Sequence, residues 1–518
     1  MGVRILVLSL VVFSELFQTL AEDVIVKVEG MASIATTDDN FVCATLDWWP
    51  SGKCNYGQCP WEKAGILNLD LNNTILFNAI KAFSSLRIRI GGSLQDQVLY
   101  NVGNAVKKCP HFKNSTDGLF GFSKVSLFHL VSSMLTSKEN TRAVTTFGLN
   151  ALFGRKKISD DGLYGGNWNS KNARDFIQYS IAKGYTIDSW EFGNELCGTG
   201  VAARVEAKQY GLDSIVLKGL LNELYQNSTT KPKLVAPGGF YEKKWFSDFL
   251  QASGPNVIDG ITHHIYNLGA GVDPNLIYKI QDPLYLDQIA QTYKDLETTL
   301  KSFGPWSSAW VGESGGAYNS GGKDVSHTFV DGFWYLDQLG MTSSFNHKVF
   351  CRQTLIGGNY GLLNTTSFIP NPDYYGALLW HRLMGKNVLS TTHTGSPYLR
   401  AYSHCSRNKP GITLLLINMS NSTSFKVSVV GDENLTPIIQ EYQMTQGVQS
   451  REEYHLTPKD GNIQSDVVLL NNSPLVLTET LDIPVLNPTL TDPLSPISIR
   501  PDSIVFASLR DFHAPACA

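Results

Sequence analysis

The sequence predicts an α/β protein in which a (β/α)₈ (TIM) barrel is followed by a C-terminal β-sandwich domain. From residue 41 to residue 385, short apolar segments that end in polar residues alternate with amphipathic helical patterns. This alternation is typical of a parallel sheet covered by helices, and eight repeats fit a closed barrel better than an open sheet. After residue 385 the segments are short, rich in β-branched residues and separated by turns, as in a β-sandwich.

Eight segments have the composition of buried barrel strands. They cover residues 41–47, 86–90, 143–149, 189–193, 233–236, 260–266, 309–313 and 348–353. Helical stripes such as Ala173, Phe176 and Ile177 lie between them. A dinucleotide-binding fold is disfavoured, because no Gly-x-Gly-x-x-Gly follows the first strand.

The same patterns predict the domain boundaries. We expect the catalytic barrel at residues 41–385 and the sandwich at residues 386–518. Within residues 22–40, the alternating segment "DVIVKVEG" predicts an N-terminal strand that joins the sandwich.

Residues 1–21 have the features of a secretory signal peptide. Arg4 precedes an apolar run over residues 5–13, and the small residue Ala21 stands before Glu22. We therefore expect secretion into a cell wall or matrix, with the lysosome or vacuole as alternatives. The apolar run is too short to span a bilayer, so no transmembrane segment is expected, while peripheral association with a membrane stays open.

Composition narrows the class of partner. The chain has 518 residues, 42% of them hydrophobic, and a formal net charge of −4. These values indicate a globular protein with room for more than one domain. Its Lys and Arg residues are scattered, so no nucleic-acid partner is expected. We also expect no cofactor.

Sequons and cysteines agree with a secretory route. Eight Asn-x-Ser/Thr sequons offer N-glycosylation sites wherever they lie on the surface: Asn72, Asn114, Asn227, Asn364, Asn418, Asn421, Asn434 and Asn471. The eight cysteines allow disulfides whose pairing the sequence leaves open. For Cys54 and Cys59 a loop disulfide is favoured over zinc, because no second close Cys pair or His-rich stretch accompanies them, and no metal is expected.

Two glutamates follow barrel strands at the end where TIM-barrel active sites form. Glu195 comes just after the predicted fourth strand and Glu313 ends the seventh. Two carboxyl groups on different strands suit glycosidic bond cleavage, one as general acid and one as nucleophile. Glu191 lies inside its strand and either supports the barrel interior or faces a helix. Glu223, in a second Asn-Glu pair, is interpreted as a solvated helix position.

With these residues placed, the chain resembles glycoside hydrolase family 79, especially its plant heparanase-like and β-glucuronidase members. The matching motifs extend over nearly the whole length and include "WEFGNE", "VGESGGAY", "CATLDWWP", "LRIRIGGSLQD", "THHIYNLG", "FCRQTLIGGNYGLL" and "PNPDYYGALLWHRLMG". Residues 123–143 depart from the plant pattern, which puts the second barrel helix in doubt.

The resemblance implies the same fold and a retaining hydrolysis of β-linked glucuronic acid. It assigns Glu195 as acid/base and Glu313 as nucleophile. By the same resemblance, Asn194 would bond the sugar 2-OH, and further residues would line the sugar site: Asp47, Arg89, Tyr266 and Tyr360. The glycine-containing loop Tyr318–Lys323, which follows Glu313, would bind the carboxylate, with a flexible lid as the alternative interpretation.

Three functions follow in order of preference. The first is an exo-acting β-glucuronidase on glucuronides or glycan ends. The second is an endo-β-glucuronidase on heparan-sulfate-type or other matrix proteoglycan chains, although such a polymer needs a basic cleft and the net charge is −4. The third is an inactive carbohydrate-binding matrix protein.

Overall fold

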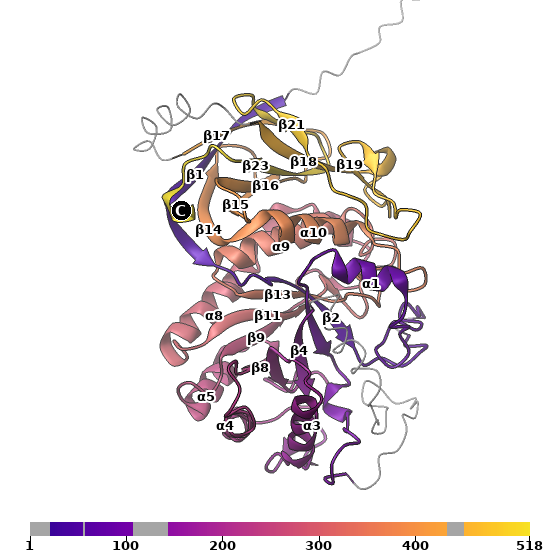
Figure 1. Ribbon diagram of the computed structural model, residues 1–518, viewed down its shortest axis with the longest axis vertical. Helices are drawn as coiled ribbons and strands as arrows, with labels where there is room; N and C mark the ends of the chain where they lie inside the picture. The colour runs from indigo at the N-terminus through magenta and orange to yellow at the C-terminus, as the bar shows by residue number, and fades with distance from the viewer. Residues whose placement is uncertain (1–20, 55–56, 107–142, 432–449) are drawn as a thin grey trace, which may run out of the picture.

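The computed structural model describes residues 21–54, 57–106, 143–431 and 450–518. It contains a parallel barrel and a C-terminal sheet, with helices α9 (Asp331–Ser344) and α10 (Pro372–Leu383) between them (Figure 1). The predicted second barrel helix, at residues 123–143, lies almost wholly outside the described residues, as does the signal peptide apart from Ala21.

The barrel closes with eight parallel strands, which confirms the predicted fold class. In spatial order the strands are β11, β13, β2, β3, β4, β7, β8 and β9, and β9 pairs back to β11. Their bounds are β2 (Val42–Asp47), β3 (Arg87–Gly91), β4 (Val144–Leu149), β7 (Ser189–Phe192), β8 (Lys233–Phe240), β9 (Gly260–Ile265), β11 (Ser308–Ser314) and β13 (Val349–Arg352). Every predicted strand is present, and β8 runs four residues past its predicted end.

Amphipathic helices surround this barrel and bury their apolar faces against it. They are α1 (Thr74–Lys81), α3 (Lys171–Ala182), α4 (Ala207–Leu224), α5 (Lys243–Ser253), α6 (Leu276–Ile280), α7 (Pro283–Asp287) and α8 (Ala290–Phe303). Helix α9 is different, because it is buried along 13 of its residues. It packs against the barrel on one side and against the C-terminal sheet on the other, so it has no solvated face (Figure 1).

The C-terminal domain is one continuous, mostly antiparallel sheet of eleven strands. The strands are β1 (Ala21–Thr36), β14 (Met384–His393), β15 (Leu399–Ser406), β16 (Ile412–Asn418), β17 (Ser424–Val430), β18 (Arg451–Pro458), β19 (Val468–Leu470), β20 (Ser473–Pro474), β21 (Thr489–Thr491), β22 (Ile497–Ile499) and β23 (Ser503–Leu509). Strand β1 comes from the N-terminus and inserts between β14 and β17.

Side-chain alternation on β16 shows how the sheet separates two cores. Leu414 and Leu416 pack in a core formed within the sheet, against residues of β1, β17 and β22. Leu415 and Ile417 point the other way and join the large core of the barrel and its helices. Because both faces are covered, β16 is buried at all its positions, unlike a strand with one solvated face.

Buried charges also join the two parts. Arg400 of β15 donates to Asp337 of α9 at 2.8 Å and to Asp287 at 2.6 Å, and the Tyr402 hydroxyl donates to Asp337 at 2.6 Å. Asp337 is fully buried, so its charge requires these partners. The contacts hold the sheet in a defined position on the barrel.

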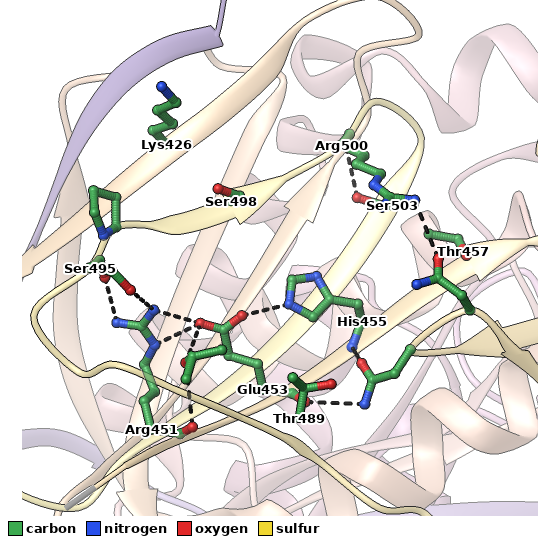
Figure 2. Close-up of a pocket in the computed structure, with 14 residues that line it drawn as sticks. Lys426, Arg451, Glu453, His455, Thr457, Thr489, Ser495, Ser498, Arg500 and Ser503 are labelled. Atoms are coloured by element: carbon green, nitrogen blue, oxygen red, sulfur yellow. Dashed lines mark hydrogen bonds and ion pairs between the residues drawn. The ribbon is translucent and has the colours of Figure 1, made fainter.

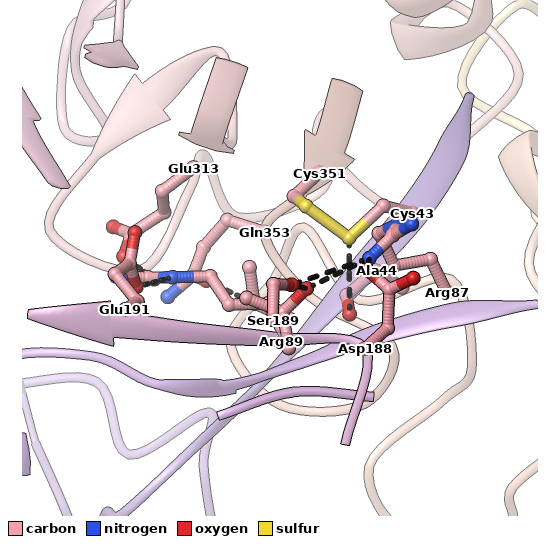
Figure 3. The surroundings of a disulfide bond; sticks show 12 residues. Cys43, Ala44, Arg87, Arg89, Asp188, Ser189, Glu191, Glu313, Cys351 and Gln353 are labelled. Atoms are coloured by element: carbon pink, nitrogen blue, oxygen red, sulfur yellow. Dashed lines mark hydrogen bonds and ion pairs between the residues drawn. A yellow bond between two sulfur atoms is a disulfide. The ribbon is translucent and has the colours of Figure 1, made fainter. Parts of the chain in front are cut away.

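A disulfide closes the seam between the first and last barrel strands. Cys43 of β2 and Cys351 of β13 are register partners with Cα atoms 4.1 Å apart, although 308 positions separate them in sequence (Figure 3). Cross-linking so long a loop removes entropy from the unfolded chain, a stabilisation of about 5 kcal/mol in the chain-entropy account. The bond therefore reinforces the barrel where its two ends meet.

Four further cysteines of the described residues form two more disulfides, and Cys109 lies outside the described residues. Cys54 and Cys59 form the predicted loop disulfide, and Cys405 pairs with Cys517 near the C-terminus. Cys197 is a buried free thiol.

The sequons differ in accessibility. Asn72, Asn227, Asn364 and Asn421 are exposed. The expectation for Asn418 is wrong for the folded protein, because its side chain is fully buried and its amide donates to the carbonyls of Thr423 and Arg500. The sequons at 114 and 434 lie outside the described residues. Across the described ranges, helices long and apolar enough to cross a membrane are absent.

Candidate active site

The predicted site residues come together at the carboxyl ends of the barrel strands. A cavity of about 330 Å³ opens there, and six of them line it: Asp47, Glu195, Tyr266, Glu313, Tyr318 and Tyr360. The other two, Arg89 and Asn194, are buried and contact each other at 2.7 Å. The structure therefore assembles all eight residues in one place.

Glu195 is presented by a tight turn after β7. Its backbone has φ 53°, a left-handed conformation that costs energy for a residue with a side chain. Its N–H donates to the carbonyl of Gly238 on the neighbouring strand β8 at 2.6 Å. A Cβ at Gly239 would lie 3.1 Å from the Glu195 Cα, so β8 approaches the turn closely only because that residue is glycine.

The Arg89 guanidinium lies beneath the cavity and forms hydrogen bonds with three side chains. It donates from Nε to Glu191 at 2.6 Å, from Nη1 to Glu313 at 2.7 Å and from Nη2 to Asn194 at 2.7 Å. Of the two interpretations of Glu191, the inward one is correct, since its side chain is fully buried and paired with Arg89 inside the barrel (Figure 3). One cation thus connects strands β3, β7 and β11.

The two candidate catalytic carboxylates lie close together around His264. The Nδ1 of His264 is 3.0 Å from Glu195 Oε1 and 4.0 Å from Glu313 Oε2. One oxygen of Glu195 and one of Glu313 lie within 4.8 Å of each other. These three residues could geometrically surround a cation, but Arg89 already supplies a positive charge to Glu313, and the expectation of no metal stays a prediction.

The surroundings shift the pKa values of these carboxylates in opposite directions. Burial raises the pKa of Glu195, and this effect outweighs the lowering by His264. Burial also acts to raise the pKa of Glu313, but His264, Arg89 and the Tyr266 hydroxyl lower it more, so the net shift is downward. The hydroxyl of Tyr266 donates to Glu313 Oε1 at 2.6 Å. One glutamate therefore tends to keep its proton and the other to lose it.

Two buried aspartates support the site. Asp47 accepts from Gln353 Nε2 at 2.9 Å, and burial together with the Glu313 charge raises its pKa to about 7. Asp96 accepts the N–H of Asn194 at 2.8 Å and that of Ala151 at 2.7 Å, and burial raises its pKa to about 7. Asp96 fixes the backbone one residue before Glu195, whereas Asp47 lies on the cavity wall.

Aromatic rings build one wall of the cavity. Tyr360 is buried and packs edge-on against Trp61, with ring centroids 6.3 Å apart. The Trp61 indole donates to Ser320 Oγ at 2.8 Å, which ties the loop after Glu313 to this wall. Tyr318 is 44% exposed and stands at the rim.

Several lining or supporting residues were not predicted from the sequence. Gln353 and His264 lie at or near the ends of predicted strands, so the strand-end rule that selected Glu313 could have found them. Asp96 lies in the recognised motif "LRIRIGGSLQD". Trp49, Lys53 and Trp61 belong to an irregular loop, where periodicity offers no signal.

Comparisons with known proteins agree with this geometry. The family described as "Glycosyl hydrolase family 79, N-terminal domain" matches residues 23–340. Heparanase-like protein 2 of Arabidopsis thaliana is 52% identical, over 95% of this chain and 94% of that protein. Baicalin-beta-D-glucuronidase of Scutellaria baicalensis is 40% identical, over 94% of this chain and 92% of that protein.

A solved structure shows the same fold at low identity. The GH51 arabinofuranosidase from Xanthomonas axonopodis pv. citri has a TM-score of 0.64 with 14% identity, over 94% of this chain and 99% of that one. The family match, together with the barrel and the paired carboxylates, identifies a glycosidase, which has a carbohydrate substrate. The chain belongs to glycoside hydrolase family 79.

We expect Arg89→Leu to destabilise the fold by about 3–5 kcal/mol, because it leaves the Glu191 and Glu313 carboxylates buried without a counter-ion. Adding Glu191→Gln should recover part of that loss, measured as free energies of unfolding in urea. Arg174→Leu, which breaks the exposed pair with Glu223, is the control and should leave the free energy of unfolding nearly unchanged. Strictly additive effects of the Arg89 and Glu191 substitutions would contradict the coupling.

Proposed function

We propose that the protein is a retaining exo-β-glucuronidase that removes β-linked glucuronic acid from small glucuronides or glycan ends. The observation that carries the proposal is the pair Glu195 and Glu313, with oxygens within 4.8 Å across a small cavity and pKa shifts of opposite sign. Retaining glycosidases have carboxyl groups about 5–5.5 Å apart, and inverting ones about 6.5–9.5 Å. The spacing supports retention.

The chemistry divides between the two glutamates. Glu195, protonated, gives its proton to the glycosidic oxygen while ionised Glu313 attacks the anomeric carbon. The C1–O bond to the aglycone breaks, the aglycone leaves as an alcohol, and a glucuronyl ester forms on Glu313. Glu195 then takes a proton from water, whose oxygen attacks C1 and releases Glu313 and glucuronic acid with retained configuration.

Neighbouring groups prepare each step. Arg89 and Tyr266 each hold one oxygen of Glu313, which orients the nucleophile before substrate arrives. Asn194 uses its carbonyl oxygen for Arg89, which leaves its amide N–H group for the sugar 2-OH. That contact strengthens in the oxocarbenium-like transition state.

Recognition of the glucuronate carboxylate is supported by two features of the rim. Lys53 is the only Lys or Arg among the residues that line the cavity in the described part of the chain. Its Nζ lies 4.2 Å from the centre of the Trp49 ring. The loop after Tyr318 has positive φ at Asn319, Ser320 and Gly321, conformations that turn successive backbone groups in one direction.

The small cavity favours exo action. About 330 Å³ fits one or two sugar rings, and one lining cation does not form the long basic cleft that a heparan-sulfate-type chain needs. The similarity to baicalin-beta-D-glucuronidase of Scutellaria baicalensis also supports exo action on small glucuronides. Endo cleavage and a silent carbohydrate-binding protein are the alternatives that the assays below distinguish.

We expect Glu313→Gln to lower kcat on an aryl β-glucuronide by about 10³-fold or more, and Glu195→Gln by about 10²–10⁴-fold. Glu223→Gln, in the exposed Asn-Glu pair on α4, is the matched control and should keep full activity. Product NMR should show the β-anomer first. Full activity of Glu313→Gln would overturn the mechanism, and initial release of the α-anomer would overturn retention. Cleavage of a polymer without release of monosaccharide would indicate endo action. A wild-type protein without activity would indicate a carbohydrate-binding protein.

The pH profile provides an independent test. Tyr266→Phe removes a hydrogen bond to ionised Glu313, so the pKa of Glu313 should rise. Because the nucleophile must be ionised, the acid limb of kcat/KM should move to higher pH by about 0.5–1 unit, while the basic limb, governed by Glu195, stays in place. An acid limb that is unmoved or shifts to lower pH would contradict this assignment.

We expect Lys53 to form an ion pair with the carboxylate of the glucuronide substrate. Lys53→Gln should raise KM about tenfold for an aryl β-glucuronide, since an ion-paired hydrogen bond contributes about 1.5–3 kcal/mol, and leave the aryl β-glucoside unaffected. Lys53→Arg should retain much of the preference. The exposed Lys63→Gln is the control. Equal changes in KM for the aryl β-glucuronide and the aryl β-glucoside would show that Lys53 shapes the cavity but does not bind the carboxylate.

We further propose that the protein is secreted and N-glycosylated. The support is the N-terminal segment, three disulfides and four exposed sequons. Enzymatic removal of N-glycans from protein expressed in a secretory host should increase its electrophoretic mobility, and site mapping should find Asn418 unmodified. Protein retained inside the cell without glycans would contradict the proposal.

A further inference from the structure

A second cavity, of about 630 Å³, lies in the C-terminal sheet, on a different domain from the catalytic glutamates (Figure 2). Its walls come from β17, β18, β21 and β22 and from the loops beside them. Its volume falls within the range of small-ligand sites. Its lining is dominated by charged, hydroxyl and amide side chains, which distinguishes it from a packing defect in an apolar core.

The deepest part of this cavity is a closed charge network along β18. Arg451 Nε donates to Glu453 at 2.7 Å, and His455 Nε2 lies 2.6 Å from the other Glu453 oxygen. Arg451 also donates from Nη1 to the carbonyl of Ser495 at 2.7 Å. Arg451 and Glu453 are 3% and 4% exposed, so the network is a rigid floor (Figure 2). It neutralises Glu453, the only carboxylate that the described part of the chain contributes to the lining.

Two further cations remain available at the sides of the cavity. Lys426 forms no ion pair with any described residue, and the Arg500 guanidinium donates only to the neutral Asn472 amide, at 3.3 Å. Figure 2 places Lys426 and Arg500 apart from each other, beyond the Arg451–Glu453–His455 network. The lining therefore carries an excess of positive charge on a chain whose formal net charge is −4. A recessed site of one sign concentrates ions of the opposite sign.

Hydroxyl groups surround these cations. Within the described residues, the hydroxyls of Thr457, Thr489 and Ser498 have no protein hydrogen-bond partner. Among the described residues, the lining has no Phe, Tyr or Trp ring for stacking on a neutral sugar, and Pro496 is its only apolar residue. Cations spaced apart and separated by hydroxyls suit a ligand that has both carboxylates and hydroxyls.

We propose that this cavity is a second, non-catalytic carbohydrate site, which binds an acidic oligosaccharide through its uronate carboxylates. Lys426 and Arg500 pair with carboxylates on separate sugar units, and the threonine and serine hydroxyls bond the sugar hydroxyls. No hydrolysis occurs there, because the only lining carboxylate is held by Arg451 and His455. The site would keep the enzyme on an acidic glycan while the barrel acts on its ends.

The sequon at Asn471 has a consequence for this site. Asn471 lines the cavity, its side-chain oxygen accepts the N–H of His455 at 2.9 Å, and its amide donates to Asn487. A glycan on that nitrogen would replace one of its two N–H groups, so the bond to the Asn487 carbonyl or the one to the Glu453 carbonyl would be lost, and the glycan would occupy the cavity. Asn471 should therefore be unmodified in the mature protein.

The test uses the full-length protein and tetragalacturonate, an α-linked uronate tetramer that a β-glucuronidase does not cleave. Binding is measured by calorimetry for wild type, for Lys426→Glu/Arg500→Glu and for Lys208→Glu/Lys459→Glu, a control with the same charge change at exposed positions outside both cavities. Neutral cellotetraose and inorganic sulfate are the comparison ligands, and aryl β-glucuronide turnover is measured in parallel.

We expect wild type and control to bind the uronate alike, and Lys426→Glu/Arg500→Glu to bind at least about tenfold more weakly with unchanged aryl glucuronide turnover. The proposal would be overturned if all three proteins bound the uronate equally, or if cellotetraose bound as tightly as the uronate. It would also be overturned if sulfate alone bound tightly, or if Asn471 carried a glycan. The proposal does not depend on the catalytic one. The two proposals can therefore fail separately. If only the Lys426→Glu/Arg500→Glu variant lost uronate binding while the wild type cleaved no glucuronide, the result would support this site and refute the proposed activity.

Discussion

The candidate active site depends on the hydrogen bonds that the buried Arg89 guanidinium donates to Glu191, Glu313 and Asn194. A guanidinium that is 1% exposed cannot be tolerated inside a barrel unless its charge and its N–H groups are satisfied. Glu191 accepts from Nε within β7, which leaves the two Nη nitrogens to donate to groups at the cavity. Those donors position Glu313 and Asn194. A structural ion pair thereby positions residues to which we assign the catalysis.

The two proposed catalytic glutamates have the same side chain and nearly the same burial, yet their surroundings shift their pKa values in opposite directions. Glu313 receives hydrogen bonds from a permanent cation and from the Tyr266 hydroxyl, so its ionised form is stabilised. Glu195 receives one contact, from His264, which does not offset its burial. His264 stands between them and couples the two proton affinities. The division of roles is therefore a property of the environment and not of the residue type.

Much of the barrel and the core of its site could be predicted, because both follow local rules. All eight strands were visible as apolar segments, and strand ends selected Glu195 and Glu313 over Glu191 and Glu223. The resemblance to the family added Asp47, Arg89, Asn194 and the three tyrosines, which the structure places around one cavity. His264, Gln353 and Lys53 were missed, since their importance lies in which residues face them across the barrel. Asn418 has a sequon but is enclosed by its own sheet.

By itself, the sequence determined the order of strands and helices, the two glutamates at strand ends and the family, because periodicity and motif are properties of neighbouring residues. Only the tertiary structure decided the rest. It brought Cys43 to Cys351 across 308 positions, placed β1 between β14 and β17, turned Glu191 toward Arg89, and assembled the polar cavity above Arg451 and Glu453. Each of these depends on closing long loops and on the desolvation of charges, which no local pattern records.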